Sequence, residues 1–201
     1  MKRIIILLIL SICVSLSSTE QEKEPYCIDQ QIDTSDWVAF PITNGWFIEG
    51  QSSGEEHIEV SFPTYPQYME ETDSQPAFFT ADDEEGMTFR IASMPLPDKD
   101  FNLRESVTRM ADLITQSPNK KLFAVAYPES NDSGFSIIWI QDERLTTETF
   151  IKSDHFIYVL ETTDKNEIYR DAEFLDETQF NLFIKHILKT RPFVKSFVLK
   201  D

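Results

Sequence analysis

The first half of the chain is dominated by short stretches in which apolar and polar residues alternate. The clearest stretch is 57–62, where Ile58, Val60 and Phe62 alternate with polar residues. Alternation with a period of two is typical of a strand that buries one face. Further strands are predicted at 37–40, 45–48, 77–81 and 87–94, with prolines or Asn44-Gly45 between several of them.

Two segments place apolar residues at helical spacing instead. The first runs from Leu103 to Ile114 and ends before Pro118. Asn102, followed three residues later by Glu105, is typical of a helix N-cap. These residues predict one helix.

The second helical segment carries an apolar stripe from Phe180 to Leu188. Asp176 can cap its start and Pro192 is expected to stop it. His186 lies off the stripe, so we expect an exposed side chain. A final strand is predicted at 193–199.

The remaining segments between the two helices also resemble strands. They lie at 121–127, 135–140, 145–151 and 155–160. The connections between consecutive strands are too short for helical crossovers, so most of the pairing must be antiparallel. The predicted fold class is therefore α+β, an antiparallel β-sheet with helices packed on it.

The N-terminus has the form of a secretory signal peptide. Lys2 and Arg3 precede an apolar run, and small serines follow it. The run is about 11 residues, whereas a membrane-spanning helix needs about 20. We predict a signal peptide at 1–18, a polar tail at 19–36 and a single α+β domain at 37–201.

Cys13 leaves the fate of the N-terminus open. Leu10 and Ser11 match a bacterial lipobox, whereas Ile12 stands where Gly or Ala is usual. The alternatives are lipidation at Cys13, ordinary cleavage near Ser17 or Ser18, and a retained N-terminal anchor. In both cases Cys27 has no intramolecular partner and is a free thiol or an intermolecular link.

The charge balance narrows the choice of partners. The chain has 18 basic and 35 acidic residues, a formal net charge of −17. Nucleic acid and anionic membrane surfaces would repel such a chain. We therefore expect a protein partner, no nucleic acid, and membrane contact only through a lipid anchor or an uncleaved signal segment. The acidic residues at 82–85 are expected to form a solvated hairpin turn. Asn131 begins a glycosylation sequon, which matters only in a eukaryotic secretory pathway.

No intact catalytic or metal-binding motif is present. Asp98, Asp100 and Asn102 match the start of a calcium-binding loop, but Leu103 and Arg109 stand where Gly and Glu are needed. The sequence contains no phosphate-binding glycine loop, HExxH or GxSxG. We assign no catalytic residue, cofactor or metal.

Two alternatives stay open beside a non-catalytic role. A small hydrolase or metal-dependent enzyme could use His57, Glu59 or His155. A ligand- or carbohydrate-binding module could use Trp46, which follows Asn44-Gly45 and is also the candidate partner-binding residue. Trp139 lies in an apolar strand and is expected in the core.

Several features in order resemble the PsbP-like group of exported domains. The strand and the FPxxP pattern at 58–66 come first, followed by the strand at 88–94. The remaining features are the helix from Leu103, the hairpin at 146–160, the helix from Phe180 and the closing Ser196-Phe197. The resemblance spans 37–200 and implies an antiparallel sheet sandwiched by helices. Members are mainly accessory or binding proteins without shared catalytic residues. We therefore expect an exported, non-catalytic accessory or protein-binding domain of the cell envelope or periplasm.

Overall fold

The structure, a computed structural model, describes residues 30–48, 51–73, 75–98, 100–126, 134–165, 169 and 177–200. The signal peptide predicted at 1–18 lies outside the described residues. So do Cys13, Cys27, Asn131 and the Asp176 cap.

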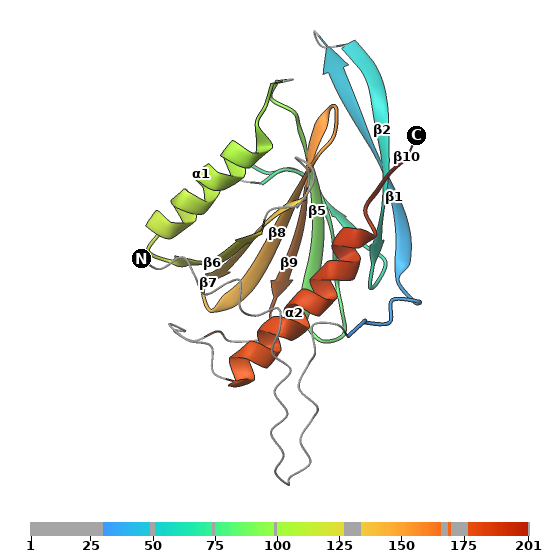
Figure 1. Ribbon diagram of the computed structural model, residues 1–201. Coiled ribbons are helices and arrows are strands. Elements are labelled where there is room, and N and C mark those ends of the chain that lie inside the picture. Colours follow the sequence, from blue (N-terminus) through green and yellow to red (C-terminus); the bar gives the residue numbers. More distant parts are fainter. Residues whose placement is uncertain are drawn as a thin grey trace.

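Strands alternate with two helices along the described chain (Figure 1). The elements are β1 (Val38–Ile48), β2 (Gln51–Phe62), β3 (Gln67–Met69), β4 (Phe78–Asp82), β5 (Met87–Pro95), α1 (Leu103–Gln116), β6 (Lys120–Ala126), β7 (Phe135–Gln141), β8 (Arg144–Lys152), β9 (Phe156–Asp164), α2 (Glu177–Lys195) and β10 (Val198–Lys200).

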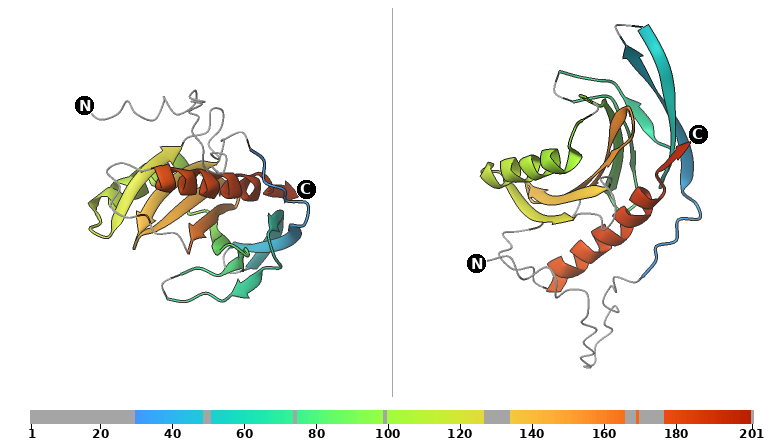
Figure 2. Two further views of the ribbon diagram at one scale, coloured as in Figure 1. Left: turned by 90° about the horizontal axis from the view of Figure 1, so that it is seen from below. Right: turned by 45° about the horizontal axis from the view of Figure 1, so that its top comes forward.

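The strands form two antiparallel sheets. The larger has seven strands in the order β3-β4-β5-β9-β8-β7-β6, and the smaller has three in the order β1-β2-β10. Helix α2 and the small sheet pack on one face of the large sheet, and α1 packs on the other (Figures 1 and 2). The predicted α+β class with antiparallel strands and packed helices is confirmed.

The core between the two sheets explains the alternation seen in the sequence. Ile58, Val60 and Phe62 of β2 are buried against β5, β9 and the end of α2. The ring of Phe193 lies 5.3 Å from the rings of both Phe62 and Phe89. Burying one such side chain contributes about 1.5–3 kcal/mol, so this aromatic cluster joins the two sheets and α2 firmly.

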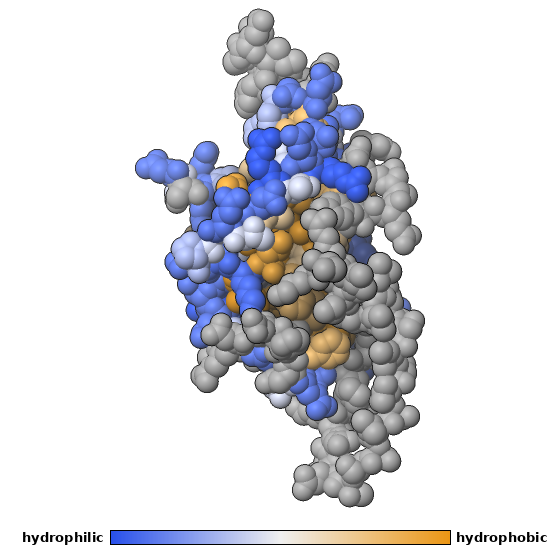
Figure 3. All heavy atoms as spheres, turned by 60° about the vertical axis from the view of Figure 1, so that its left-hand side comes forward, coloured by the Kyte–Doolittle hydropathy of each residue, from blue (hydrophilic) through white to orange (hydrophobic). Residues whose placement is uncertain are grey.

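Helix α1 covers only part of the opposite face. Its buried residues, Leu103, Val107, Ala111 and Ile114, contact the β6, β7 and β8 part of the sheet and the start of β9. Asn102 accepts a hydrogen bond from the backbone N–H of Glu105 at 3.1 Å, which confirms the predicted N-cap. In the view of Figure 3, which brings the α1 side forward, hydrophilic residues surround a central zone of apolar ones.

Two predictions based on proline are wrong. The segments at 37–40 and 45–48 form one strand, β1, which runs through Pro41 and pairs with β2. Pro41 is tolerated because β1 is an edge strand. Helix α2 likewise continues through Pro192 to Lys195, so the strand predicted at 193–199 shrinks to β10. Burial of Phe193 offsets the lost backbone hydrogen bond.

The predicted exposure of His186 is also wrong. His186 is 1% exposed, and its Nε2 lies 3.0 Å from the hydroxyl of Thr147. Thr162 and Thr190 complete this buried polar cluster. Burial, with a smaller effect of Lys189, lowers the pKa of His186 to about 3. The histidine is therefore a neutral core residue.

The acidic turn at 82–85 packs against α2 and is not simply solvated. Lys189 pairs with both Asp83 and Glu85, and Lys185 pairs with Glu85 at 2.8 Å. Hydrogen bonds from the two lysines lower the pKa of Glu85 to about 2. These acidic residues are therefore part of the contact between the β4–β5 hairpin and the last helix.

Candidate functional site

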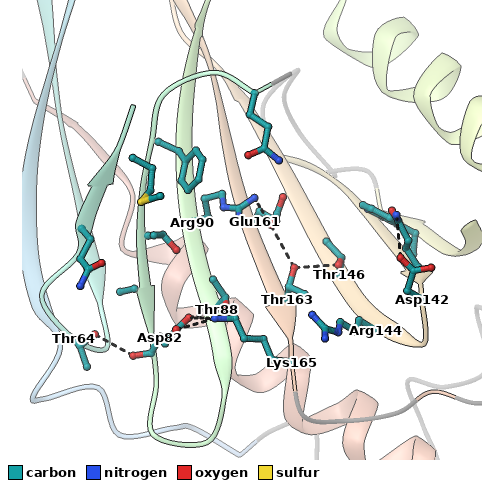
Figure 4. Close-up of a pocket in the computed structure, with 18 of the residues that line it drawn as sticks. Thr64, Asp82, Thr88, Arg90, Asp142, Arg144, Thr146, Glu161, Thr163 and Lys165 are labelled. Atoms are coloured by element: carbon teal, nitrogen blue, oxygen red, sulfur yellow. Dashed lines mark hydrogen bonds and ion pairs between the residues drawn. The ribbon is translucent and has the colours of Figure 1, made fainter. Parts of the chain in front are cut away.

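The part of the large sheet that α1 leaves uncovered forms an open groove of about 990 Å³ (Figure 4). We call this concavity the groove. Its charged lining residues balance, with three basic and three acidic side chains. They are Arg90, Arg144, Lys165, Asp82, Asp142 and Glu161.

A row of charged residues crosses the sheet where the groove meets the α1-covered half. The strand register places Arg90 of β5 opposite Glu161 of β9, and Glu161 opposite Glu148 of β8. Arg90 pairs with Glu161 at 3.2 Å and stacks 4.3 Å above the ring of Phe78. This arrangement holds Arg90 in place, and within the described part of the chain Glu148 has no ion-pair partner.

Glu148 consequently has an altered protonation equilibrium. Burial and the facing carboxylate of Glu161 raise the pKa of Glu148 to about 7. Lys120 and Arg90 act in the opposite sense but are outweighed. The indole N–H of Trp139 also favours the ionised form, although its nitrogen has no partner at standard hydrogen-bonding geometry. Glu148 therefore exchanges its proton near neutral pH.

Threonines make the floor of the groove. The hydroxyls of Thr146 and Thr163 lie 3.1 Å apart, and Thr88 donates to Asp82 at 2.8 Å. Lys165 donates to the same carboxylate at 2.8 Å. Partial burial would raise the pKa of Asp82, but the hydrogen bonds from Lys165 and Thr88 outweigh it and the pKa is lowered. The floor is thus polar, with its charges paired.

One end of the groove is rich in hydrogen-bond donors. Gln141 of β7 lies opposite Lys120 on one side and opposite Arg144 on the other. We call these three residues the cationic corner. Among the described residues Arg144 has no ion-pair partner, whereas Lys120 stacks 4.2 Å above the ring of Trp139.

The hairpin turn beside this corner has an unusual backbone. Asp142 and Glu143 connect β7 to β8 with φ values of 49° and 64°. Residues other than glycine rarely adopt positive φ, and each such residue costs about 1–3 kcal/mol. The turn keeps Gln141 and Arg144 directly opposite each other.

Exposed apolar side chains border the other end of the groove. Tyr65 and Met69, which are 72% and 44% exposed, line it. The ring of Tyr65 packs edge-on to Phe40 at 5.5 Å. Tyr68, between them on β3, points to the opposite face, where it lies 5.2 Å from Phe79 and lines a separate small cavity. We call Tyr65 and Met69 the apolar rim.

The residues proposed for a hydrolase or metal site lie elsewhere. His57 and Glu59 point away from the core on β2, where His57 bonds Thr43 at 3.0 Å and Glu59 pairs with Lys200 at 3.2 Å. His155 lies in the β8–β9 turn. Within the described ranges, no three His, Cys, Asp or Glu side chains converge to hold a metal.

The two tryptophans singled out in the sequence have different outcomes. Trp46 of β1 pairs through its backbone with Gly54 of β2, and its side chain lies outside the described residues. Trp139 is 9% exposed and packs under α1, which confirms its predicted core position. It also lines the groove.

Sequence reasoning missed the charged row altogether. Arg90, Glu148 and Glu161 each occupy the middle of a strand in which several neighbouring residues are buried. Charged residues at such positions are a usable signal, because a long apolar strand seldom contains one without a partner.

Comparison with known proteins assigns neither a family nor a role to the chain. No family model matches the chain, and no curated protein matches it. Among solved structures, the chain is similar to the Ran-binding protein Mog1p of Saccharomyces cerevisiae, with 8% identity and a TM-score of 0.42. That match covers 82% of this chain and 97% of Mog1p. Neither α1 nor α2, the helices among the described residues, is long and apolar enough to cross a membrane.

Proposed function

We propose that this chain is an exported, non-catalytic accessory domain that binds a partner protein through the groove and its apolar rim. The observation that carries the proposal is the joint exposure of Tyr65 and Met69, which both line a concave surface. Exposed apolar side chains gathered at a concave surface mark interaction sites. Tyrosine and methionine are enriched in protein interfaces.

The charge arrangement of the groove supports binding. Arg90 is held by Glu161 and Lys165 by Asp82, so these charged groups are already in position before a partner arrives. Preorganised polar groups around an apolar anchor provide specificity at low entropic cost. The apolar rim would supply the affinity and the paired charges the specificity.

Export is supported by the signal-peptide pattern at 1–18 and by the resemblance to the PsbP-like group. The intact mass of the processed protein tests it. A start at Cys13 with added acyl mass would identify a lipoprotein, and a start near Ser18 would identify an exported soluble form. An unprocessed Met1 would contradict export.

Site-specific photo-crosslinking tests the binding surface. A benzophenone amino acid replaces Tyr65 in one variant and Leu113, which is 61% exposed on α1, in the control. We expect a discrete crosslinked protein from position 65 in native cells and none from position 113. Adding Met69→Ser should reduce the product. An identical product from both positions, or none from position 65, would contradict the proposal.

A further inference from the structure

One ring nitrogen of the buried His186 has no hydrogen-bond partner. Among the described residues, no group bonds to Nδ1 of this side chain, which is 1% exposed. His186 lies on α2 and contacts Thr147 and Thr162, whose neighbours Thr146 and Thr163 line the groove. Because side chains alternate between the two faces of a sheet, His186 packs on the face opposite the groove.

The threonines around His186 determine which ring nitrogen carries the proton. Thr190 donates its only hydroxyl proton to the backbone carbonyl of His186 at 2.9 Å, since a carbonyl can only accept. The hydroxyls of Thr162 and Thr190 lie 2.7 Å apart, so Thr162 donates to Thr190. Thr162 can then only accept from Nε2 of His186, 3.5 Å away. Nε2 therefore carries the proton and also directs it at Thr147, 3.0 Å away.

This tautomer makes Nδ1 a hydrogen-bond acceptor. A neutral imidazole has one N–H donor and one acceptor nitrogen. Burial, with a smaller effect of Lys189, lowers the pKa of His186 to about 3, so the ring is neutral near pH 7. Because buried polar groups are almost always hydrogen-bonded, Nδ1 requires a donor.

A cavity of about 10 Å³ lies beside the ring and is the right size for one water molecule. Its lining carries two carboxylates and two ammonium groups, so their charges balance. Within the described ranges, no three His, Cys, Asp or Glu side chains converge to hold a metal. Both observations favour a small neutral molecule. The lining residues are Glu85, Met87, Asp164, Lys185, His186 and Lys189.

We propose that this cavity binds one water molecule, which donates one hydrogen bond to Nδ1 of His186 and the other to the carboxylate of Asp164. Asp164 is 9% exposed and stands two residues after Thr162 on β9, so it faces the same side of the sheet as His186. A carboxylate offers about four acceptor positions, so Asp164 can accept from water alongside its other contacts. Glu85 is the poorer acceptor, because its side chain is 55% exposed and pairs with both lysines.

The bound water gives the last helix a second connection to the large sheet. Phe193 anchors the end of α2 in the apolar core, and the water links the middle of α2 to the end of β9. The site is independent of the proposed function, because the groove lies on the opposite face of the sheet.

NMR of the full chain, labelled with ¹⁵N in its histidine rings, tests the tautomer and the water together. The chain has three histidines, and the His186→Gln variant assigns the signals of His186. We expect Nε2 to carry the proton of this ring throughout the range from pH 8 to pH 5. We also expect a nuclear Overhauser effect between slowly exchanging water and the ring proton Hε1, which lies beside Nδ1. His57, exposed on β2, is the internal control and should show no such effect.

A matched pair of variants separates water from exchange through the threonine hydroxyls. Asp164→Asn keeps an acceptor oxygen and should retain the water signal at His186. Asp164→Leu has nearly the same shape without an acceptor and should lose that signal while the tautomer is unchanged. A crystal structure of the native chain should show an ordered water about 2.7–3.2 Å from Nδ1.

A proton on Nδ1, or no water signal at His186 in the native chain, would overturn the inference. An equal signal in Asp164→Leu would overturn the bridge to Asp164, because the threonine hydroxyls would then account for it. If Asp164→Leu does not fold, the native crystal structure decides, and no ordered water beside Nδ1 would overturn the site. Failure of the crosslinking at Tyr65 leaves all these measurements intact.

Discussion

Replacing Glu148 with glutamine tests the electrostatics of the sheet directly. The substitution keeps the size of the side chain and removes its charge. In the native chain this carboxyl faces Glu161 and titrates near pH 7 in place of its ordinary value of 4.5. The variant should therefore alter how stability depends on pH between these two values.

The magnitude follows from proton linkage. An acid with a raised pKa in the folded state holds its proton where the unfolded chain has lost it, so its stabilising contribution is full below pH 4.5 and is lost as the pH rises through 7. Between pH 7 and pH 5, a folded pKa of about 7 adds about 2 kcal/mol to the free energy of unfolding. The Glu148→Gln variant does not gain this stability on acidification, because glutamine does not titrate.

His186 has the opposite effect on the pH dependence of stability, and this makes the contribution of Glu148 measurable. Its pKa is lowered in the folded state, so its contribution is full above pH 6.5 and is lost as the pH falls toward 3. That loss is also about 2 kcal/mol by pH 5. The two residues nearly cancel in the native chain, whereas Glu148→Gln should lose stability on acidification.

Urea unfolding at pH 7 and pH 5, followed by tryptophan fluorescence, measures the difference. Glu71→Gln removes an exposed carboxylate and serves as the control. We expect the free energy of unfolding of Glu148→Gln to fall by about 2 kcal/mol more than that of the native chain between the two pH values. Parallel changes in all three proteins would refute the reasoning, because Glu148 would then titrate alike in the folded and unfolded states.

Three further variants, one of them a double substitution, test other contacts by urea unfolding. Converting Asp142 to Asn and Glu143 to Gly should stabilise the protein by about 1–2 kcal/mol, since Asn-Gly suits positive φ at both positions; a loss of stability would show that the turn has another conformation. Asn102→Ala should cost about 1 kcal/mol through loss of the helix cap, and no change would mean that the cap contributes nothing. Phe193→Ala should cost about 3–5 kcal/mol because the ring is fully buried, and a cost below 1 kcal/mol would contradict the packing described.

The local pattern of apolar and polar residues predicted most of the strands and helices, because the burial of one face of an element repeats at a fixed spacing within its own segment. Ile58, Val60 and Phe62 alternate with polar residues because only one face of β2 is buried. This alternation can be recognised in the sequence alone. The predictions at Pro41 and Pro192 failed because edge position and the burial of Phe193 depend on distant strands. The prediction that His186 is exposed was wrong for the same reason, because its hydrogen-bond partner Thr147 lies 39 residues away in the sequence.

The candidate site was harder to predict because sheet register creates it. Arg90, Glu148 and Glu161 lie on three different strands, and only their pairing brings opposite and like charges together. The cationic corner depends equally on register, with Gln141 between Lys120 and Arg144. No spacing within one segment encodes these neighbours, whereas His57 and Glu59, two residues apart, attracted notice without forming a site.

The position of α2 and β10 late in the sequence constrains the order of folding. β10 pairs with β2, and Phe193 fills the space between the two sheets. Partners separated by well over half the chain must meet before that core can close, and such distant contacts form slowly. Until residues 177–200 arrive, the core between β2 and β5 lacks Phe193, and its incomplete packing leaves apolar side chains prone to self-association. A chaperone that shields these strands during synthesis or transport would therefore be most useful just before the last helix docks.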